Sequence, residues 1–360
     1  MTRRTDRRKP AWDKENYTEP EQAGFDAISS AARALYPGQE GVYYGTPIPY
    51  VLGGGDPLDG VEIWKSEHGV PHWHYITYGF TELYEKESCD PDESGYGFEL
   101  TFRLRRGVED SPPVWPVSLL QNLARYVFSS GNAFGPGHHI NCNGPIALET
   151  DTLLTALGFC VDPELGALDT PNGHFIFLQA VAITEDEMDA MMCWNGEKFL
   201  ALIAHFLPLC VAGLERDSLL RTPTFYDAWR AGMERDGSST AFLHMDELGL
   251  EWADGRGTLR IGAGHAKTLA HMLKARVGKG QTLFLQGQQR SVQFQPGARP
   301  AFVCAEQIPK LTLTGEALEE LCGLLTPHAG TYGMKVMPLT VELVPTRITD
   351  RDGNVINIIE

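Results

Sequence analysis

The alternation of apolar and polar residues at 96–105 is the feature that most restricts the fold of this chain. Every second residue is aromatic or aliphatic, and those between are glycine, polar or charged: Tyr96, Phe98, Leu100, Phe102 and Leu104 against Gly97, Glu99, Thr101, Arg103 and Arg105. Because successive side chains of a strand point to opposite faces, this pattern predicts a long β-strand with one apolar face. Residues 72–80 predict a second strand. The chain must therefore contain a sheet whose apolar face is covered.

Helical patterns occur between the strand patterns without a regular alternation. In the first half they predict helices at 21–36, from Pro116 to about Ser130, from Thr184 and at about 197–206, with a buried strand at 174–183. Glu187 stands three residues after Thr184, which is the spacing of a capping box. In the second half they predict helices at 263–275 and 315–325. Strands are predicted there at 248–252, 257–261, 281–286, 301–304, 309–313, 335–343 and 354–359. This irregular order favours an α+β fold over a doubly wound sheet.

The length of 360 residues predicts two domains, because a single hydrophobic core rarely serves more than roughly 250–300 residues. We expect two α/β-mixed domains, each a mostly antiparallel or mixed sheet packed with helices. The predicted divisions are a disordered basic tail at 1–20, an N-terminal domain at 21–220, a short linker at 221–245 and a C-terminal domain at 246–360. A Gly-Ser-Ser tract at 237–239 lies within the linker.

The charge of the chain is strongly acidic outside its first ten residues. Those ten carry a local +4, and subtracting it from the net charge of −17 leaves −21 on the remaining 350 residues. An acidic body repels phosphate backbones, so direct nucleic-acid binding is not expected. It suits a basic protein partner, although many proteins of the cytoplasm are also acidic.

The other global features favour a cytoplasmic protein. There is no run of about 18 apolar residues, and the N-terminus lacks an apolar signal region, so we expect neither a membrane span nor secretion. The seven cysteines form no CxxC pair, and several lie in apolar runs, so we expect reduced, buried thiols.

The sharpest motif for an enzyme is His72-Trp73-His74. Alternate strand residues share a face, so both imidazoles are able to approach one metal ion, with His138, His139 and Cys142 as further ligands. A metal-dependent hydrolase using His72, His74 and His138 is therefore one hypothesis. The alternative, which we favour, is that these histidines have a structural role at the start of a strand.

No nucleophile-elbow, zinc-protease, P-loop or dinucleotide-binding pattern is present, so we expect neither catalysis nor a cofactor or metal. Aromatic residues are more informative. Tyr126 and Phe134 flank a loop at 131–145 that is rich in Gly, Asn and His, and aromatic side chains beside such a loop suit peptide binding. Core packing is the alternative explanation, and we favour it for Phe128.

Several motifs resemble the suppressor of fused family. They lie at residues 50–59, 72–84, 95–104, 115–128, 170–179 and 194–196, in the order of that family. Residues 251–261, 309–321 and 333–345 are similar to its C-terminal domain. The chain lacks the long low-complexity insertion and the extended N-terminal tail of the animal protein, and in this it resembles the bacterial branch.

The resemblance implies a protein that grips a partner segment between its two domains and has no catalytic activity. The animal protein binds Gli-type transcription factors in this way. By resemblance, Tyr126 and Leu259 match peptide-contacting positions. The family's acidic contacts fall at His138 and near Val161, beside Asp162, so two of its carboxylates are missing at those positions.

Two roles follow from this resemblance. Bacterial relatives are thought to be immunity proteins that neutralise toxins, and the acidic body fits a basic toxin. The other role is a peptide-binding regulator of a transcription factor, as in animals.

Overall fold

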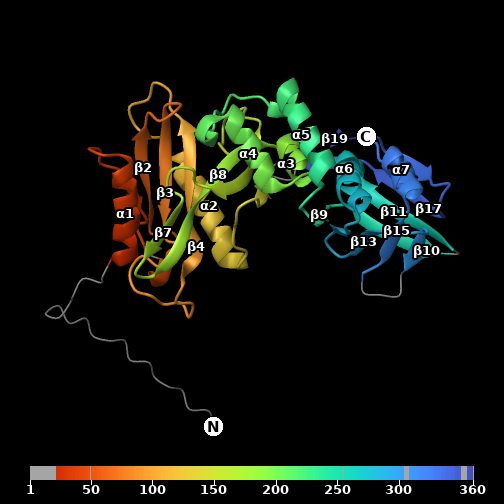
Figure 1. Cartoon of the computed structure of the whole chain (residues 1–360), viewed down its shortest axis with the longest axis horizontal. Coiled ribbons are helices and arrows are strands. Elements are labelled where there is room, and N and C mark those ends of the chain that lie inside the picture. The colour runs from red at the N-terminus through yellow and green to blue at the C-terminus, as the bar shows by residue number, and fades with distance from the viewer. Residues whose placement is uncertain (1–21, 49, 254, 304–307, 350–354, 360) are drawn as a thin grey trace, which may run out of the picture.

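The computed structural model describes residues 22–48, 50–253, 255–303, 308–349 and 355–359, which form two lobes side by side (Figure 1). The predicted basic tail at 1–20 lies outside the described residues. The first lobe contains α1 (Ala23–Leu35), β1 (Val42–Gly45), η1 (Tyr50–Leu52), β2 (Gly60–Ser66), β3 (His72–Tyr78), β4 (Glu93–Arg105), α2 (Trp115–Ser130), β5 (His139–Asn141), β6 (Leu154–Val161), β7 (Ala167–Thr170), β8 (Gly173–Thr184), α3 (Glu185–Met192), α4 (Gly196–Phe206), η2 (Pro208–Cys210) and η3 (Leu219–Arg221).

A mixed eight-stranded sheet forms the centre of this lobe, in the order β1-β2-β3-β4-β8-β6-β5 with β7 beside β8. Strands β4 and β8 are parallel, and the other pairs are antiparallel. Helix α2 packs its apolar side on one face, against the predicted apolar side of β4. Helix α1 packs on the opposite face through Ile28 and Ala32. The long strand predicted from the alternation at 96–105 is therefore confirmed, and both of its faces are covered.

The described part of the second lobe contains two larger sheets and one two-stranded sheet. Its elements are α5 (Pro223–Asp236), β9 (Phe242–His244), β10 (Leu248–Ala253), β11 (Arg256–Gly262), η4 (Ala263–His265), α6 (Ala266–Arg276), η5 (Val277–Lys279), β12 (Leu283–Gln286), β13 (Ser291–Pro296), β14 (Ala301–Val303), β15 (Lys310–Leu313), α7 (Gly315–Leu324), β16 (Gly330–Gly333), β17 (Leu339–Val344), β18 (Thr346–Thr349) and β19 (Val355–Ile359). The sheets have the orders β10-β11-β17-β16 and β14-β15-β13-β12-β9, and β18 pairs with β19. The predicted α+β class is confirmed.

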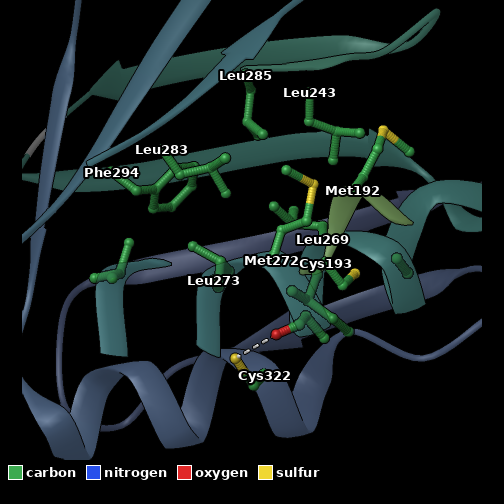
Figure 2. Close-up of a cluster of buried hydrophobic side chains, with 14 of the residues drawn as sticks. Met192, Cys193, Leu243, Leu269, Met272, Leu273, Leu283, Leu285, Phe294 and Cys322 are labelled. Carbon is green, nitrogen blue, oxygen red and sulfur yellow. Dashed lines mark hydrogen bonds between the residues drawn. The ribbon is translucent and has the colours of Figure 1, made fainter. Parts of the chain in front are cut away.

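The two lobes share one hydrophobic core, which fixes their relative position. Figure 2 shows Met192 and Cys193, at the end of α3 of the first lobe, among side chains of the second such as Leu243 on β9 and Met272 on α6. All of these side chains are almost completely buried. Because burial of an apolar side chain contributes about 1.5–3 kcal/mol, separating the lobes would be costly.

Polar contacts add to this junction. The Trp229 indole N–H of α5 donates to the Ala190 carbonyl of α3 at 2.9 Å, and the Thr268 hydroxyl of α6 donates to the Asp189 carboxylate at 2.6 Å. The segment 221–245, predicted as a short linker, holds α5 and β9 and buries Trp229 in the shared core. The exact domain boundaries stay predictions.

The helix start predicted at Thr184 is present as a capping box at α3. The Thr184 N–H donates to the Glu187 carboxylate at 3.0 Å, and Arg216 pairs with the same carboxylate at 2.6 Å. Both the cap and the ion pair hold α3 in the orientation that carries Met192 into the second lobe. Among the helices in the described part of the chain, none is both long and apolar enough to cross a membrane.

Asp189 makes the junction sensitive to pH. Burial raises the pKa of this carboxyl from 3.8 to about 6, so the folded chain keeps a proton that the unfolded chain has released. The free energy of unfolding should therefore fall by about 1–3 kcal/mol as the pH rises from about 4 to about 6. In urea unfolding measured across this range, Asp189→Asn should flatten the slope and the exposed Asp227→Asn should not. An unchanged slope in Asp189→Asn would contradict this assignment.

Candidate partner-binding site

Strands β5 and β9 are the edge strands of their sheets, one in each lobe. Burial first, and then the charges of the adjacent His138 and of His244 on β9, lower the pKa of His139 on β5, so the two strands lie near each other. Among the described residues, no backbone hydrogen bond joins the two strands. Two unpaired edges therefore border the same region between the lobes.

The hydrogen bonds of β5 show which of its backbone groups are unpaired. The His138 carbonyl accepts from Phe159 of β6, and the Cys142 N–H donates to Thr155, each at 2.9 Å. In an antiparallel pair the bonded residues alternate, so His139 and Asn141 direct their N–H and C=O groups away from β6. These two residues offer the outer edge of the first sheet.

Strand β9 offers an equivalent edge. The Ala241 carbonyl accepts from Phe284, and the Met245 N–H donates to Gln286, each at 2.9 Å, so odd-numbered residues bond β12. The backbone groups of Phe242 and His244 point outward. Their side chains are also exposed, while Leu243 is buried in the shared core. We call the outward backbone groups of these four residues, with Tyr126 and His138, the edge site.

An aromatic stack lies beside β5. Phe134 stacks on Phe159 of β6 with ring centroids 4.2 Å apart, and the 39 % exposed Tyr126 of α2 stacks on Phe134 at 5.6 Å. Tyr126 therefore has a fixed ring plane with one exposed face, which suits contact with a partner's side chain. The predicted link between Tyr126 and the loop after α2 is present in the structure.

Glycines hold this loop in place. Gly137 has φ of +78° and packs on Gly196 at the start of α4, where an added Cβ would come within 2.2 Å of the Gly137 carbonyl. Only two glycines allow this approach. The contact positions His138, which is exposed, directly before β5.

The edge site is electrically almost neutral at its centre. Burial, and then the like charges of His138 and His244, lower the pKa of His139 to about 4. His139 is therefore uncharged near neutral pH. A neutral surface with exposed backbone donors and acceptors is suited to pairing with an extended segment of another chain.

Asp162, one of the predicted contacts, is buried inside the first lobe. Its carboxylate pairs with Arg103 at 2.6 and 3.0 Å and accepts from the Thr101 hydroxyl at 2.7 Å. Burial acts to raise the pKa of Asp162, but the contact with His74 and then the charge of Arg103 hold this pKa well below its usual range. We therefore do not include Asp162 in the edge site, because its buried carboxylate is already bonded to Arg103 and Thr101.

Leu259 is also buried, with 0 % exposure, on the core side of β11 opposite Val341. Its position in the shared core explains its apolar character, and the edge site leaves it out as well. Of the four residues expected to contact a partner, Tyr126 and His138 remain. Asn141, Phe242 and His244 were missed, since no sequence pattern identifies a three-residue edge strand.

Two of the three histidines of the metal hypothesis are neighbours, since the rings of His72 and His74 have centroids 6.3 Å apart, whereas His138 lies elsewhere. His74 is fully buried, with Nδ1 2.8 Å from the Tyr36 hydroxyl and Nε2 3.3 Å from Asp162. His72 Nδ1 donates to the Val70 carbonyl at 2.7 Å. His138 lies in the first lobe beyond β6, and the part of the chain that the structure describes contains no metal-binding group of three such residues. The hydrolase hypothesis has no supporting geometry.

Comparisons with known proteins agree with this architecture. The family model for suppressor of fused protein (SUFU) matches residues 54–217. The suppressor of fused homologs of Homo sapiens and Mus musculus are each 35% identical over 234 residues, which is 60% of this chain and 48% of theirs. The chain thus spans about half the length of the curated relatives it matches.

Two solved structures are similar. The crystal structure of Drosophila Suppressor of Fused has a TM-score of 0.72 at 22% identity, covering 92% of this chain and 99% of that one, which shows a shared fold. A chain of the Sufu-Fu complex has a TM-score of 0.54 at 31% identity, covering 57% and 96%. These matches define a two-lobed α+β protein with the suppressor of fused fold. The chain belongs to the suppressor of fused family.

The pair formed by Arg103 and Asp162 should dominate the stability of the first lobe. Arg103→Leu leaves a buried carboxylate without its partner, and we expect a loss of about 3–5 kcal/mol in the free energy of unfolding. The matched control is Arg105→Leu, two residues along the same strand, whose pair with Glu215 at 3.3 Å is exposed. Its loss should stay below about 1 kcal/mol. Equal losses in urea unfolding would contradict this role.

Proposed function

We propose that this chain is a non-catalytic protein-binding module that takes an extended partner segment at the edge site. The observation that carries the proposal is that β5 and β9 are each an edge strand of their sheet, one in each lobe, and that His139 and His244 on them are near enough for their charges to interact. A partner strand gains main-chain hydrogen bonds from such edges, and side chains beside them supply specificity. The related Sufu-Fu structure, by its title, is that of a complex.

Tyr126 and Phe242 are the anchors that this arrangement offers. Both rings are partly exposed and both stack on a buried or half-buried ring, Tyr126 on Phe134 and Phe242 on Phe284 at 5.1 Å. Rigid aromatic side chains contribute much of the binding energy at protein interfaces. The proposal therefore assigns affinity to the strand edges and selection of partner side chains to these rings.

The finer role that we propose is that of an immunity-type protein in a bacterial cell, which binds and neutralises a toxin. Two features support it: the resemblance to the compact bacterial branch, and the charge of −21 outside the first ten residues. An acidic surface accelerates encounters with a basic partner. No feature of the edge site favours a Gli-type peptide, and that alternative stays a prediction.

Proline substitutions test the edge site directly. Asn141→Pro and His244→Pro each remove one outward N–H without removing a bond to β6 or β12, so partner affinity should fall about tenfold or more. Thr331→Pro is the matched control, because Thr331 is an exposed residue on the outer edge of β16. Tagged wild type and variants are used to capture the partner from an extract of the source cells, and affinity is then measured with the purified partner. Unchanged affinity in both edge variants would reject the edge site.

Amide hydrogen exchange of the captured complex identifies the bound surface independently. We expect slower exchange at His139, Asn141, Phe242 and His244 in the complex, because these N–H groups become hydrogen-bonded. Protection confined to other surfaces would show that the chain binds proteins elsewhere.

The role of charge predicts a specific dependence on salt. Raising the ionic strength from about 0.05 to 0.5 M should slow association with a basic toxin by tenfold or more and change dissociation little. Stopped-flow mixing measures the two rates separately. An association rate that does not change with ionic strength would contradict the immunity-type role. It would not contradict the proposal that a partner binds at the edge site.

A further inference from the structure

A polar cavity of about 390 Å³ lies at the junction of the two lobes, and the edge site shares none of its residues. The start of α4 lines it from the first lobe, and the ends of α5 and α6, with the segments that follow them, line it from the second. Its lining includes Asn195, Lys198, Asp236, Ser239, Arg276 and Gln281, all of which have polar or charged side chains.

Arg276, the last residue of α6, lines this cavity and is only 8 % exposed. Its Nε donates to the Thr282 carbonyl at 2.6 Å, and its Nη1 donates to the Ser238 carbonyl at 2.7 Å. Nη2 has no hydrogen-bond partner among the described residues, and no carboxylate of these residues forms an ion pair with Arg276. Because a guanidinium stays protonated at ordinary pH, a buried positive charge borders the cavity without a counter-ion from the described chain.

The buried arginine of the first lobe has the counter-ion that Arg276 lacks. Arg103 pairs with Asp162 at 2.6 Å, and the partly buried Arg216 pairs with Glu187 at 2.6 Å. Arg276 receives only the partial negative charge of two carbonyls and of the end of α6. Burial accordingly lowers the pKa of its guanidinium, and no carboxylate opposes this effect. The position therefore suits an anion from outside the chain.

The remaining charges at the cavity do not supply this counter-ion. The Asp236 carboxylate accepts from Lys198 Nζ at 2.9 Å and from the Trp194 indole N–H at 3.0 Å. Arg235 pairs with the same carboxylate at 2.8 Å. Two cations thus already balance Asp236, and the charge of Arg276 is in excess. This excess of positive charge lies within a chain whose net charge is −17.

We propose that the cavity binds the phosphate group of a small phosphorylated molecule. A phosphate accepts charge-assisted hydrogen bonds from the N–H groups that Arg276 leaves unused and from the Lys198 ammonium. The amides of Asn195 and Gln281 and the Ser239 hydroxyl offer neutral donors at the same cavity. A volume of about 390 Å³ is in the range of small-molecule sites, so an organic group fits beside the phosphate.

Inorganic phosphate is the probe for this site in the full chain. Lys198 belongs to the first lobe and Arg276 to the second, so bound phosphate holds the lobes together and raises the melting temperature. We expect a saturable rise of about 2–4 °C at roughly a tenfold excess over the dissociation constant, at constant ionic strength and pH. Phosphorus NMR titration measures that constant independently. A linear rise without binding in the NMR titration is the general effect of a kosmotropic salt and would overturn the proposal.

Gln281→Glu is the variant that distinguishes this site from other basic surfaces. Gln281 is exposed at the cavity, and its N–H donates to the Arg276 carbonyl at 2.9 Å. The new carboxylate supplies the missing counter-charge, so this variant should melt higher than the wild type without phosphate. It should also bind phosphate about tenfold or more weakly, because two negative charges then compete for one position.

Arg230→Gln is the matched control, because it removes an exposed positive charge of α5 that does not line the cavity. Its affinity for phosphate should equal that of the wild type. If Gln281→Glu binds phosphate as tightly as the wild type, or if Arg230→Gln loses as much affinity as Gln281→Glu, the phosphate site is wrong. The proposal for the edge site does not depend on this result.

Discussion

The packing of the end of α3 into the second lobe is the constraint on which the rest of the structure depends. Met192 and Cys193 belong to a helix that begins at the last strand of the first sheet, yet they are buried among residues of α6, β9 and β12. This shared core sets the distance between two sheets that have no strand in common. It thereby places the edges of β5 and β9 near one another, so the binding surface is a product of core packing.

A second constraint acts inside the first lobe, where the polar side of β4 is buried. Arg103 and Glu99 on this side have 0 % exposure, and Asp162, which pairs with Arg103, has 1 %. The Glu99 carboxylate accepts four hydrogen bonds from Thr77, Gly79 and Thr81, and burial still raises its pKa to about 7. Buried polar groups are tolerated only when they are satisfied. The ionisable residues of this lobe therefore hold the sheet together, and the buried His74 takes part through its contacts with Tyr36 and Asp162.

Sequence patterns were sufficient to predict the helices and strands in which apolar residues recur at the spacing of one buried face. The alternation at 96–105 and the apolar face of 21–36 correctly predicted β4 and α1, and the Thr184 capping pattern predicted the start of α3. Strands β6, β13 and β16 were not predicted. Leu259 and Asp162 were expected to contact a partner because of the resemblance. Their burial depends on tertiary contacts with Val341 and Arg103, which lie far away in sequence. The edge site depends on backbone groups, which no side-chain pattern encodes.

The open edges of β5 and β9 also carry a hazard for a chain that has not yet met its partner. The unpaired N–H and C=O groups of an edge strand are able to hydrogen-bond with any extended strand, including a strand of a second copy. Such edge-to-edge pairing is a common route to aggregation of sheet proteins. Each of these strands is only three residues long, which limits the number of bonds that an incorrect strand forms. In the proposed edge site this short length favours a segment that also reaches Tyr126 and Phe242 over any strand that pairs with the backbone alone.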